Sequence, residues 1–153
     1  MMNNTVKKLQ SYDERVKLDL GCGDLKPVGY IGIDIKRTQG VDIVASALYL
    51  PIRAESIDEV RCHHLIEHFI PSEATACIKE IHRVLKKEGK AYLKIDRDWS
   101  LKRLIKKDPT HKHRYSVGEV RSMVEMFSIK KVKQKVYFYD KKLKNKIFAE
   151  LVK

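Results

Sequence analysis

The sequence predicts an α/β protein whose sheet is mostly parallel. Strand-like segments alternate with helical patterns along most of the chain, and two further alternating segments at its end indicate a hairpin. The 153 residues contain neither an internal repeat nor a low-complexity linker, so we expect one domain over residues 1–153. A chain of this length buries roughly 68–70% of its unfolded surface. Disulfides or structural metals are therefore not needed for stability.

The composition is that of an ordinary globular protein, with 43% hydrophobic and 34% charged residues. No segment approaches the ~18 apolar residues of a membrane span, and no apolar signal-peptide core follows the polar N-terminus. The cysteines Cys22, Cys62 and Cys77 are odd in number and lack CxxC spacing. This pattern argues against a disulfide scaffold or a cysteine zinc cluster. We expect a cytoplasmic protein without a membrane partner.

The net charge of +12 lies almost entirely in the last third of the chain. Residues 1–100 contain 16 Lys/Arg against 15 Asp/Glu, whereas residues 101–153 contain 16 against 5. Such an excess indicates a basic face for nucleic acid or for an acidic or phosphorylated substrate. Most of these residues are lysines, which also suit a solvated surface, and arginine forks that bind phosphates more specifically are few. Both interpretations stay open.

The first half of the chain predicts four strands. Residues 16–20 alternate between polar and apolar side chains and stop at Gly-Cys-Gly, which indicates a strand running into a tight turn. Only residues 21–29 separate this strand from the next, although a parallel crossover normally takes about a dozen residues or more. We therefore expect the first crossover helix to be a single turn or missing. The other strands are expected at residues 30–35, 41–44 and 56–62.

The second half predicts two helices, one strand and the hairpin. Ser72 is the expected N-cap of the longer helix, and Gly89 is expected to end it. The apolar stripe of this helix consists of Ala74, Cys77, Ile78, Ile81, Val84 and Leu85. A strand is expected at residues 90–95, followed by a polar loop at 96–115 and a second helix at 117–127. The two hairpin strands are expected at residues 129–138 and 145–152, and a short helix or frayed arm at residues 5–13.

Apolar residues of the hairpin suit either the core or a dimer interface. An edge strand with apolar side chains can pair with a second chain. The sequence therefore leaves the oligomeric state open, with a dimer through the hairpin as one outcome. The residues concerned are Val132, Val136, Phe138, Ile147 and Phe148.

The glycine turn after the first strand predicts a ligand site. Glycines at the carboxyl end of a strand let a ligand lie against bare backbone, and an acid ending the second strand, here Asp34, can accept both hydroxyls of a ribose. A dinucleotide site would have a third glycine where Lys26 stands and its acid ~20 residues further on, whereas Asp34 comes 11 residues after Gly23. The pattern favours a nucleoside without a pyrophosphate. A glycine turn used only for chain reversal is the alternative.

Segments spread over residues 16–97 follow the motif order of a known family. They are Leu-Asp-Leu-Gly-Cys-Gly at 18–23, Val-Asp-Ile-Val-Ala at 41–45, Leu-Pro at 50–51, Ser-Ile-Asp-Glu-Val at 56–60, Leu-Ile-Glu-His at 65–68, and Lys-Glu-Ile-His-Arg-Val-Leu-Lys at 79–86 with Gly89 behind it. This series resembles the class I (Rossmann-like) S-adenosylmethionine-dependent methyltransferases, in particular a small branch with a Leu-Glu-His motif. The resemblance implies a Rossmann-like sheet, methyl transfer and S-adenosylmethionine as cofactor.

The resemblance also implies which residues bind the cofactor. Asp19 and the backbone of the glycine turn would face its methionine and ribose parts, and Asp34 would bind the ribose hydroxyls. Ser46 and Ala47 stand where the family commonly has an adenine-contacting acid and its neighbour, so Ser46 is a departure. His63 would lie beside the amino-acid end. The full set is Asp19, Gly21, Cys22, Gly23, Asp34, Ser46, Ala47 and His63.

Residues 63–68 supply the candidate catalytic groups. His64 and His68 are the first candidates for a base that removes a proton from a hydroxyl or ammonium acceptor, with Glu67 orienting them and His111 as a second choice. The same residues form the HxxEH pattern of a zinc peptidase. That pattern requires a helix, whereas this segment directly follows a strand and no third ligand is evident, so we expect no metal. In a purely structural interpretation, Leu65 packs and Glu67 and His68 form local hydrogen bonds.

Two polar segments are expected near the same rim. Residues 96–99 leave the carboxyl end of the fifth strand, and residues 108–115 contain Asp-Pro-Thr-His, which the resembling branch often carries near its substrate mouth. These groups suit binding of an anionic substrate or supply of a base. A solvated loop with Pro109 as its turn is the equally weighted alternative.

Three functions follow from these observations. The first is an S-adenosylmethionine-dependent methyltransferase acting on an unidentified acceptor, with an anionic small molecule among the candidates. The second is a non-catalytic methyltransferase-like binding or adaptor module, which the short first crossover and Ser46 favour. The third is a basic nucleic-acid-binding protein, supported only by the charge of residues 101–153.

Overall fold

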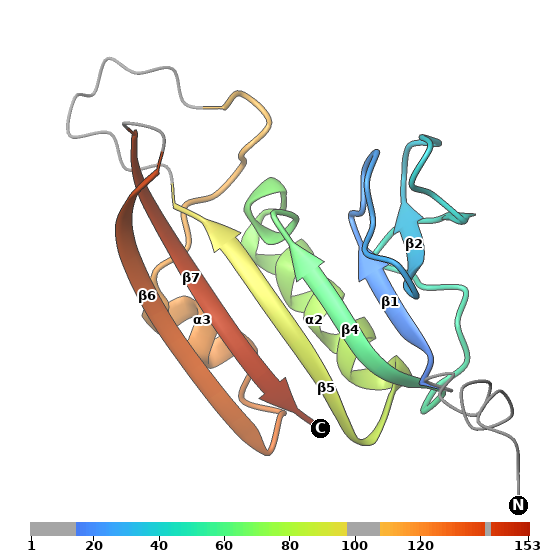
Figure 1. Ribbon diagram of the computed structural model, residues 1–153. Coiled ribbons are helices and arrows are strands. Elements are labelled where there is room, and N and C mark those ends of the chain that lie inside the picture. Colours follow the sequence, from blue (N-terminus) through green and yellow to red (C-terminus); the bar gives the residue numbers. More distant parts are fainter. Residues whose placement is uncertain (1–14, 98–107, 140–141) are drawn as a thin grey trace, which may run out of the picture.

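The chain forms a single seven-stranded sheet (Figure 1). The computed structural model describes residues 15–97, 108–139 and 142–153. The strand order is β3-β2-β1-β4-β5-β7-β6; neighbours from β3 to β5 are parallel, and β7 is antiparallel to both β5 and β6. This arrangement confirms the predicted mostly parallel sheet with a final hairpin. The strands are β1 (Lys17–Leu20), β2 (Ile31–Asp34), β3 (Ile43–Val44), β4 (Ile57–His63), β5 (Leu85–Asp96), β6 (Ile129–Tyr139) and β7 (Lys142–Val152).

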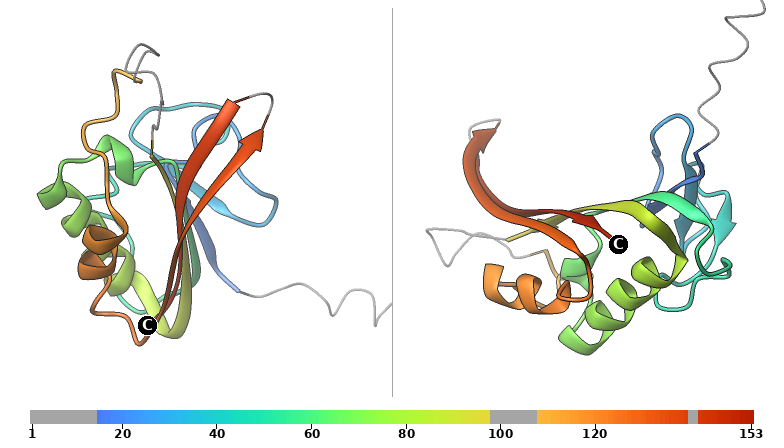
Figure 2. Two further views of the ribbon diagram at one scale, coloured as in Figure 1. Left: turned by 90° about the vertical axis from the view of Figure 1, so that its left-hand side faces the viewer. Right: turned by 90° about the horizontal axis from the view of Figure 1, so that it is seen from below.

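Helices cover only one face of this sheet in the part of the chain that the structure describes. The helix α2 (Pro71–Val84) packs on β5, and α3 (Val117–Met123) packs on β6 from the same side, as the right-hand view of Figure 2 shows. As expected, the described segment between β1 and β2 contains no helix. None of the described helices is long and apolar enough to cross a membrane.

The alternation of side chains along β5 shows the difference between the two faces. Leu93 and Ile95 are buried on the helix side, whereas Tyr92 and Lys94, which alternate with them, point to the opposite side. We call this opposite side the uncovered face. The core therefore lies between the sheet and the layer of α2 and α3.

The helix α2 follows the predicted stripe but not its predicted ends. Pro71 occupies its first position and the Ile70 N–H donates to Glu73 Oε2 at 3.1 Å, so the prediction of Ser72 as N-cap is wrong. The helix ends at Val84 rather than at Gly89, because Leu85 adopts extended backbone and starts β5. Within the stripe, the Cys77 thiol is hydrogen bonded to Cys62 of β4, and both cysteines are fully buried.

The hairpin and α3 complete the covered layer. The hairpin strands β6 and β7 confirm the prediction, and Ile147 and Val132 are core residues, whereas Val136 is exposed. The helix α3 is shorter than the predicted 117–127, since Val124 already leaves helical backbone. The predictions for residues 5–13, for Asp98 and Trp99, and for the Phe138 side chain lie outside the described residues and side chains.

Candidate active site

The glycine turn after β1 leaves backbone open to a ligand. Gly21 and Gly23 both have positive φ, at 68° and 57°, which favours glycine over other residues. The Gly21 N–H donates to Ile33 O at 2.8 Å, and a Cβ at Gly21 would lie 3.0 Å from Leu65 Cδ1. A Cβ at Gly23 would instead meet no atom within 4 Å. The turn is thus packed at its first glycine and open at its second.

Asp34 joins the end of β2 to this open glycine. Its Oδ2 accepts the N–H of Gly23 at 3.1 Å, and its Oδ1 accepts the N–H of Lys36 at 3.0 Å. Each carboxylate oxygen has a second acceptor site. The carboxylate is therefore held in place by the backbone and retains capacity for hydroxyl groups, which fits the predicted nucleoside ligand.

Close packing of backbone atoms around Gly32 fixes the strand region next to the glycine turn. A Cβ at Gly32 would lie 2.2 Å from Gly40 O and 2.8 Å from Cys22 Sγ. The Gly32 N–H donates to Asp42 Oδ2 at 2.7 Å, and Asp42 also pairs with Lys26. The hydrogen bond from Lys26, followed by that from Gly32, lowers the pKa of Asp42. Lys26, which stands where a dinucleotide site has its third glycine, thus tethers the turn to the strand region behind it.

Replacing Gly32 by alanine is expected to destabilise the protein by about 3 kcal/mol, because the new methyl group overlaps the backbone of Gly40 and has no space to move. Gly118→Ala in α3 is the matched control, since the nearest atom to its Cβ would be Ser116 Oγ at 3.8 Å. That control should be neutral or stabilising by up to ~1 kcal/mol. Urea denaturation measures both, and equal stabilities of the two variants would contradict this packing.

Asp19 lies on the uncovered face and is bound by Arg61. The Arg61 Nη1 donates to Asp19 Oδ2 at 2.6 Å, and the Asp19 side chain is 1% exposed. Burial raises the pKa of Asp19, and the Arg61 charge partly offsets this effect. The sequence did not predict Arg61 as a site residue, because its pairing with Asp19 depends on the register between two strands that are distant in sequence. Asp19 and Arg61 are direct partners in the parallel register of β1 and β4.

The side chains of three other predicted cofactor residues make contacts within the protein itself. The Cys22 thiol donates to Gly40 O at 3.4 Å, and burial, followed by the charges of Asp19 and Asp34, raises its pKa. The Ser46 Oγ accepts the Leu48 N–H at 3.2 Å. The Ala47 side chain belongs to the core. The polar atoms or apolar surface of these side chains are thus used within the fold, so a contribution of these residues to a ligand would come from the backbone.

His63, the last residue of β4, has its side chain on the uncovered face. It lines a trough there together with Tyr92 and Phe148. Burial, followed by the charges of Arg61 and Lys94, lowers the pKa of His63 to about 4. The imidazole of His63 is therefore neutral at physiological pH.

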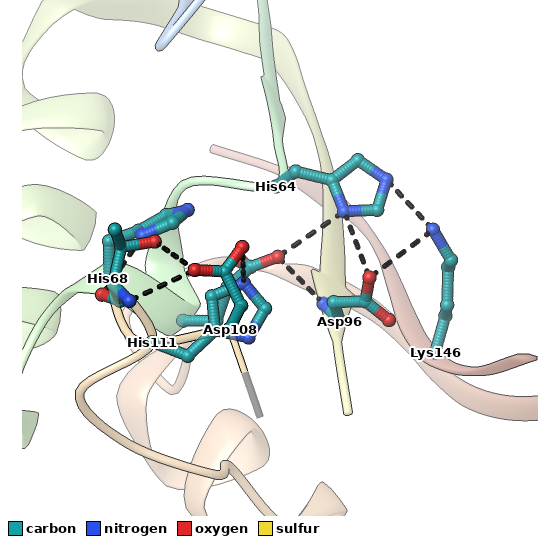
Figure 3. Close-up of polar contacts among 8 residues, drawn as sticks. His64, His68, Asp96, Asp108, His111 and Lys146 are labelled. Carbon is teal, nitrogen blue, oxygen red and sulfur yellow. Dashed lines mark hydrogen bonds and ion pairs between the residues drawn. The ribbon is translucent and has the colours of Figure 1, made fainter. Parts of the chain in front are cut away.

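The next residue, His64, is the centre of a polar cluster at the carboxyl end of β4 and β5 (Figure 3). Its backbone has a positive φ of 57°. Its Nδ1 lies 3.3 Å from Glu67 Oε1 and 3.7 Å from Asp96 Oδ2, and its Nε2 lies 2.9 Å from Lys146 Nζ. Lys146 Nζ is also 3.7 Å from Asp96 Oδ2. The sequence analysis predicted His64 and Glu67 but missed Lys146.

The contacts of His64 fix where its proton lies. An ammonium group only donates, so with a charged Lys146 the Nε2 of His64 accepts and the N–H is on Nδ1, facing Glu67. Glu67 is 1% exposed; its Oε1 also accepts the Asp96 N–H at 3.0 Å, and its Oε2 has no hydrogen-bond partner among the described residues. Burial lowers the pKa of Lys146, and the Asp96 charge opposes this effect.

The structure separates His68 from His64. His68 belongs to a short 3₁₀ turn, η1 (Ile66–His68), and its Nδ1 lies 3.1 Å from Thr110 O. Its ring meets that of His111 at 4.8 Å, edge to face, and His111 Nε2 lies 3.9 Å from Asp108 Oδ2. His64 and His68 therefore contact different groups, unlike the paired ligands of an HxxEH zinc site. His64, Glu67 and Asp96 offer ligand atoms within 4.8 Å of one another, but Lys146 places a cationic group beside them.

Comparisons with known proteins agree with this geometry. Residues 18–93 match a family described as a methyltransferase domain. A S-adenosylmethionine-dependent methyltransferase from Methanosarcina mazei is similar in structure, with 20% identity, a TM-score of 0.73 and coverage of 100% of this chain and 99% of that chain. Another from Archaeoglobus fulgidus has 17% identity, a TM-score of 0.72 and coverage of 98% and 91%. No curated protein has a significantly similar sequence.

A third similar structure carries ligands. It is a phosphoethanolamine N-methyltransferase from Haemonchus contortus in complex with phosphomonomethylethanolamine and S-adenosylhomocysteine, with 13% identity, a TM-score of 0.68 and coverage of 97% of this chain and 51% of that chain.

The strand order, the reversed strand β7 and the glycine turn define a Rossmann-like transferase fold, which the similar structures share. Residues 18–93 belong to the methyltransferase-domain family, and the chain has the fold of the class I S-adenosylmethionine-dependent methyltransferases. It is an enzyme whose cofactor is S-adenosylmethionine, which confirms the predicted fold class, activity and cofactor. The residues around the open glycine fit this cofactor, because they combine bare backbone with a fixed carboxylate.

Proposed function

We propose that the enzyme methylates a hydroxyl or amine of a small anionic acceptor, with His64 as the base. The observation that carries this proposal is the contact of His64 Nε2 with Lys146 Nζ at the carboxyl end of β4 and β5. S-adenosylmethionine supplies the reactive methyl group on its sulfonium when it is bound. The protein then has to hold the acceptor in line and remove its proton.

The proposed cofactor site surrounds the glycine turn. The backbone of Gly21 and Gly23 would lie against the methionine and ribose parts, and Asp34 would accept the ribose hydroxyls. Ile35, which follows Asp34 and is 70% exposed, offers apolar surface to the adenine ring of the cofactor. The remaining members are Asp19, whose carboxylate Arg61 binds, the backbone at Cys22, Ser46 and Ala47, and the end of β4 at His63.

His64 is suited to accept the proton of the acceptor at Nε2. Its Nδ1–H points to Glu67, so a buried carboxylate fixes the ring orientation, and the lone pair is on Nε2, where Lys146 Nζ donates to it. Once Nε2 takes the proton, the imidazolium lies between the carboxylates of Glu67 and Asp96, which stabilise its positive charge. Glu67 is thus a positioning residue for His64. His68, which contacts Thr110 instead, is a weaker candidate for a catalytic role.

Lys146 explains why the acceptor is proposed to be anionic. Its side chain is 9% exposed and its Nζ lies 3.7 Å from Asp96 Oδ2, while burial lowers the pKa of Lys146. An acceptor with a phosphate or carboxylate would pair with Lys146 and draw Nζ away from His64 Nε2, which frees the lone pair. One similar structure binds an anionic amine, phosphomonomethylethanolamine.

His64→Asn is expected to lower turnover by about 10²–10⁴-fold, the usual contribution of a general base, without changing cofactor affinity. Asparagine is chosen because it tolerates the left-handed backbone at this position. S-adenosylhomocysteine formation is measured with phosphoethanolamine and 4-hydroxybenzoate as probes, against their uncharged analogues ethanolamine and phenol. His68→Asn is the matched control and should stay near wild-type activity.

Two outcomes would overturn the proposal. Full turnover by His64→Asn would remove His64 from the chemistry. Equal use of charged and uncharged probes, or no effect of Lys146→Met on the preference for charged ones, would remove the anionic acceptor. Cofactor binding by calorimetry, done in parallel, confirms that each variant is folded.

A further inference from the structure

Basic side chains gather on the uncovered face in rows that cross the sheet. The register pairs Lys133 of β6 with Phe148 of β7, Phe148 with Lys94 of β5, and Lys94 with His63 of β4. In the next row, Lys131 pairs with Glu150.

The row of Lys131 and Glu150 continues to Tyr92 of β5 and then to Arg61 of β4. A third row, on the other side of the Lys133 row, pairs Lys135 with Lys146 and Lys146 with Asp96. Because strand side chains alternate, all members of these rows point to the side without helices. Four lysines of residues 101–153 therefore lie on one face, namely Lys131, Lys133, Lys135 and Lys146.

These rows enclose a trough of about 330 Å³. The hairpin β6–β7 curls away from the helices, so that the uncovered face is concave (Figure 2, right). Three lysines and three aromatic or imidazole rings line the trough, against one acid, Glu150. They are Lys131, Lys133, Lys135, His63, Tyr92 and Phe148.

Contacts within the trough neutralise little of the positive charge of its lysines. Glu150 Oε2 lies 3.9 Å from Lys131 Nζ, and both groups are about half exposed or more, so this pair is weak. The ammonium groups of Lys135 and Lys94 lie 5.4 Å and 6.0 Å from the centre of the Phe148 ring. The lysines are thus arranged around an aromatic ring rather than around acids.

The side chains of the uncovered face are not those of a sheet surface on which a helix packs. Parallel sheets usually have helices on both faces, and the strands of such sheets are apolar on both sides. The uncovered face instead carries lysine, arginine, histidine and tyrosine at its alternating positions. Such a face suits water or a charged partner.

We propose that this trough binds single-stranded nucleic acid. Proteins that bind single strands combine a positively charged groove, which follows the phosphates, with aromatic side chains on which bases stack. The lysines of β6 supply the charge, and Tyr92 and Phe148 supply aromatic rings. A concave trough fits a single strand, whereas a bilayer presents a flat surface and a double helix keeps its bases stacked inside. The proposal does not depend on the acceptor of the methyl group.

The first test measures binding of a fluorescein-labelled oligouridine by anisotropy at rising salt. The triple variant Lys131→Glu, Lys133→Glu and Lys135→Glu should bind at least about tenfold more weakly. Its slope of log K against log salt should be flatter by about 2, since each neutralised phosphate contributes about 0.7 for single strands. If this variant does not fold, the corresponding glutamine triple serves instead, with cofactor binding as the check.

A matched triple on the helix side makes the same charge change. Lys79 of α2, Arg121 of α3 and Lys130 of β6 are all exposed and lie away from the uncovered face. Their replacement by glutamate should leave most of the affinity and slope intact. Equal losses in both triples would overturn the trough as the site, since they would reflect net charge alone.

Stacking is tested separately from charge. Tyr92→Leu should lower the affinity by about tenfold, in line with ~1–3 kcal/mol per stacked base, while the salt slope stays unchanged. Absence of oligouridine binding by the wild-type protein would overturn the proposal. So would equal or tighter binding of duplex RNA or of phosphatidylserine vesicles, which would assign the trough to another partner.

Discussion

Asp34→Ala is expected to weaken S-adenosylmethionine binding by about 10²–10³-fold, because hydrogen bonds to a charged group are each worth ~1.5–3 kcal/mol and this residue has two roles. Its carboxylate would bind the ribose hydroxyls. It also holds the N–H groups of Gly23 and Lys36, so its loss loosens the glycine turn itself. Calorimetric titration with S-adenosylmethionine and S-adenosylhomocysteine measures the effect.

The matched control for this measurement is Asp24→Ala. Asp24 is an exposed acid in the same loop, so its removal changes the charge equally and should leave the affinity within a few-fold of wild type. Asp34→Asn, which keeps one acceptor oxygen, should fall between the two. Wild-type affinity in Asp34→Ala would show that the ribose binds elsewhere and would contradict the proposed cofactor site.

Arg61→Leu is expected to lower the free energy of unfolding by about 2–4 kcal/mol. Removing one partner of a buried ion pair typically costs ~3–5 kcal/mol, and we reduce this value because the Arg61 side chain is 29% exposed. The variant leaves the Asp19 carboxylate buried without its cation. The double variant Asp19→Asn, Arg61→Leu should recover part of the loss, since it removes the uncompensated charge.

The pH dependence of this loss follows from the sign of the Asp19 shift. Burial raises the pKa of Asp19 in the folded protein. Its contribution to stability is therefore fully present below the unfolded pKa and is lost as pH rises through the folded pKa. Without Arg61 the folded pKa rises further, so the deficit of Arg61→Leu should grow from acidic to neutral pH. Urea denaturation at several pH values measures it, and a deficit independent of pH would contradict the charge pairing.

Local signals in the sequence predicted much of the fold. The glycine turn, the short first crossover and the final hairpin each depend on neighbouring residues, and all were found. The end of α2 was predicted wrongly because Gly89 is a strong local stop, whereas Leu85 is drawn into β5 by pairing with Ile57. Tertiary pairing overrode local preference there.

The candidate site was predicted less completely. His64 and His68 were predicted as base candidates that Glu67 orients, but the left-handed backbone of His64 and the 3₁₀ turn behind it direct their side chains apart. Lys146 reaches His64 only because the antiparallel register places it opposite Asp96. That register depends on pairing between β5 and β7, segments far apart in sequence, which no local pattern shows. Arg61 was missed for a similar reason.

The buried cysteines have a consequence for the redox chemistry of the protein. Cys22, Cys62 and Cys77 are each 8% exposed or less. The hydrogen bond with Cys77, followed by burial, raises the pKa of Cys62, and burial raises that of Cys22. Oxidants and alkylating reagents attack the thiolate form of an accessible cysteine. The native chain therefore shields all three of its thiols, including the one inside the glycine turn, where we propose that the electrophilic methyl donor binds.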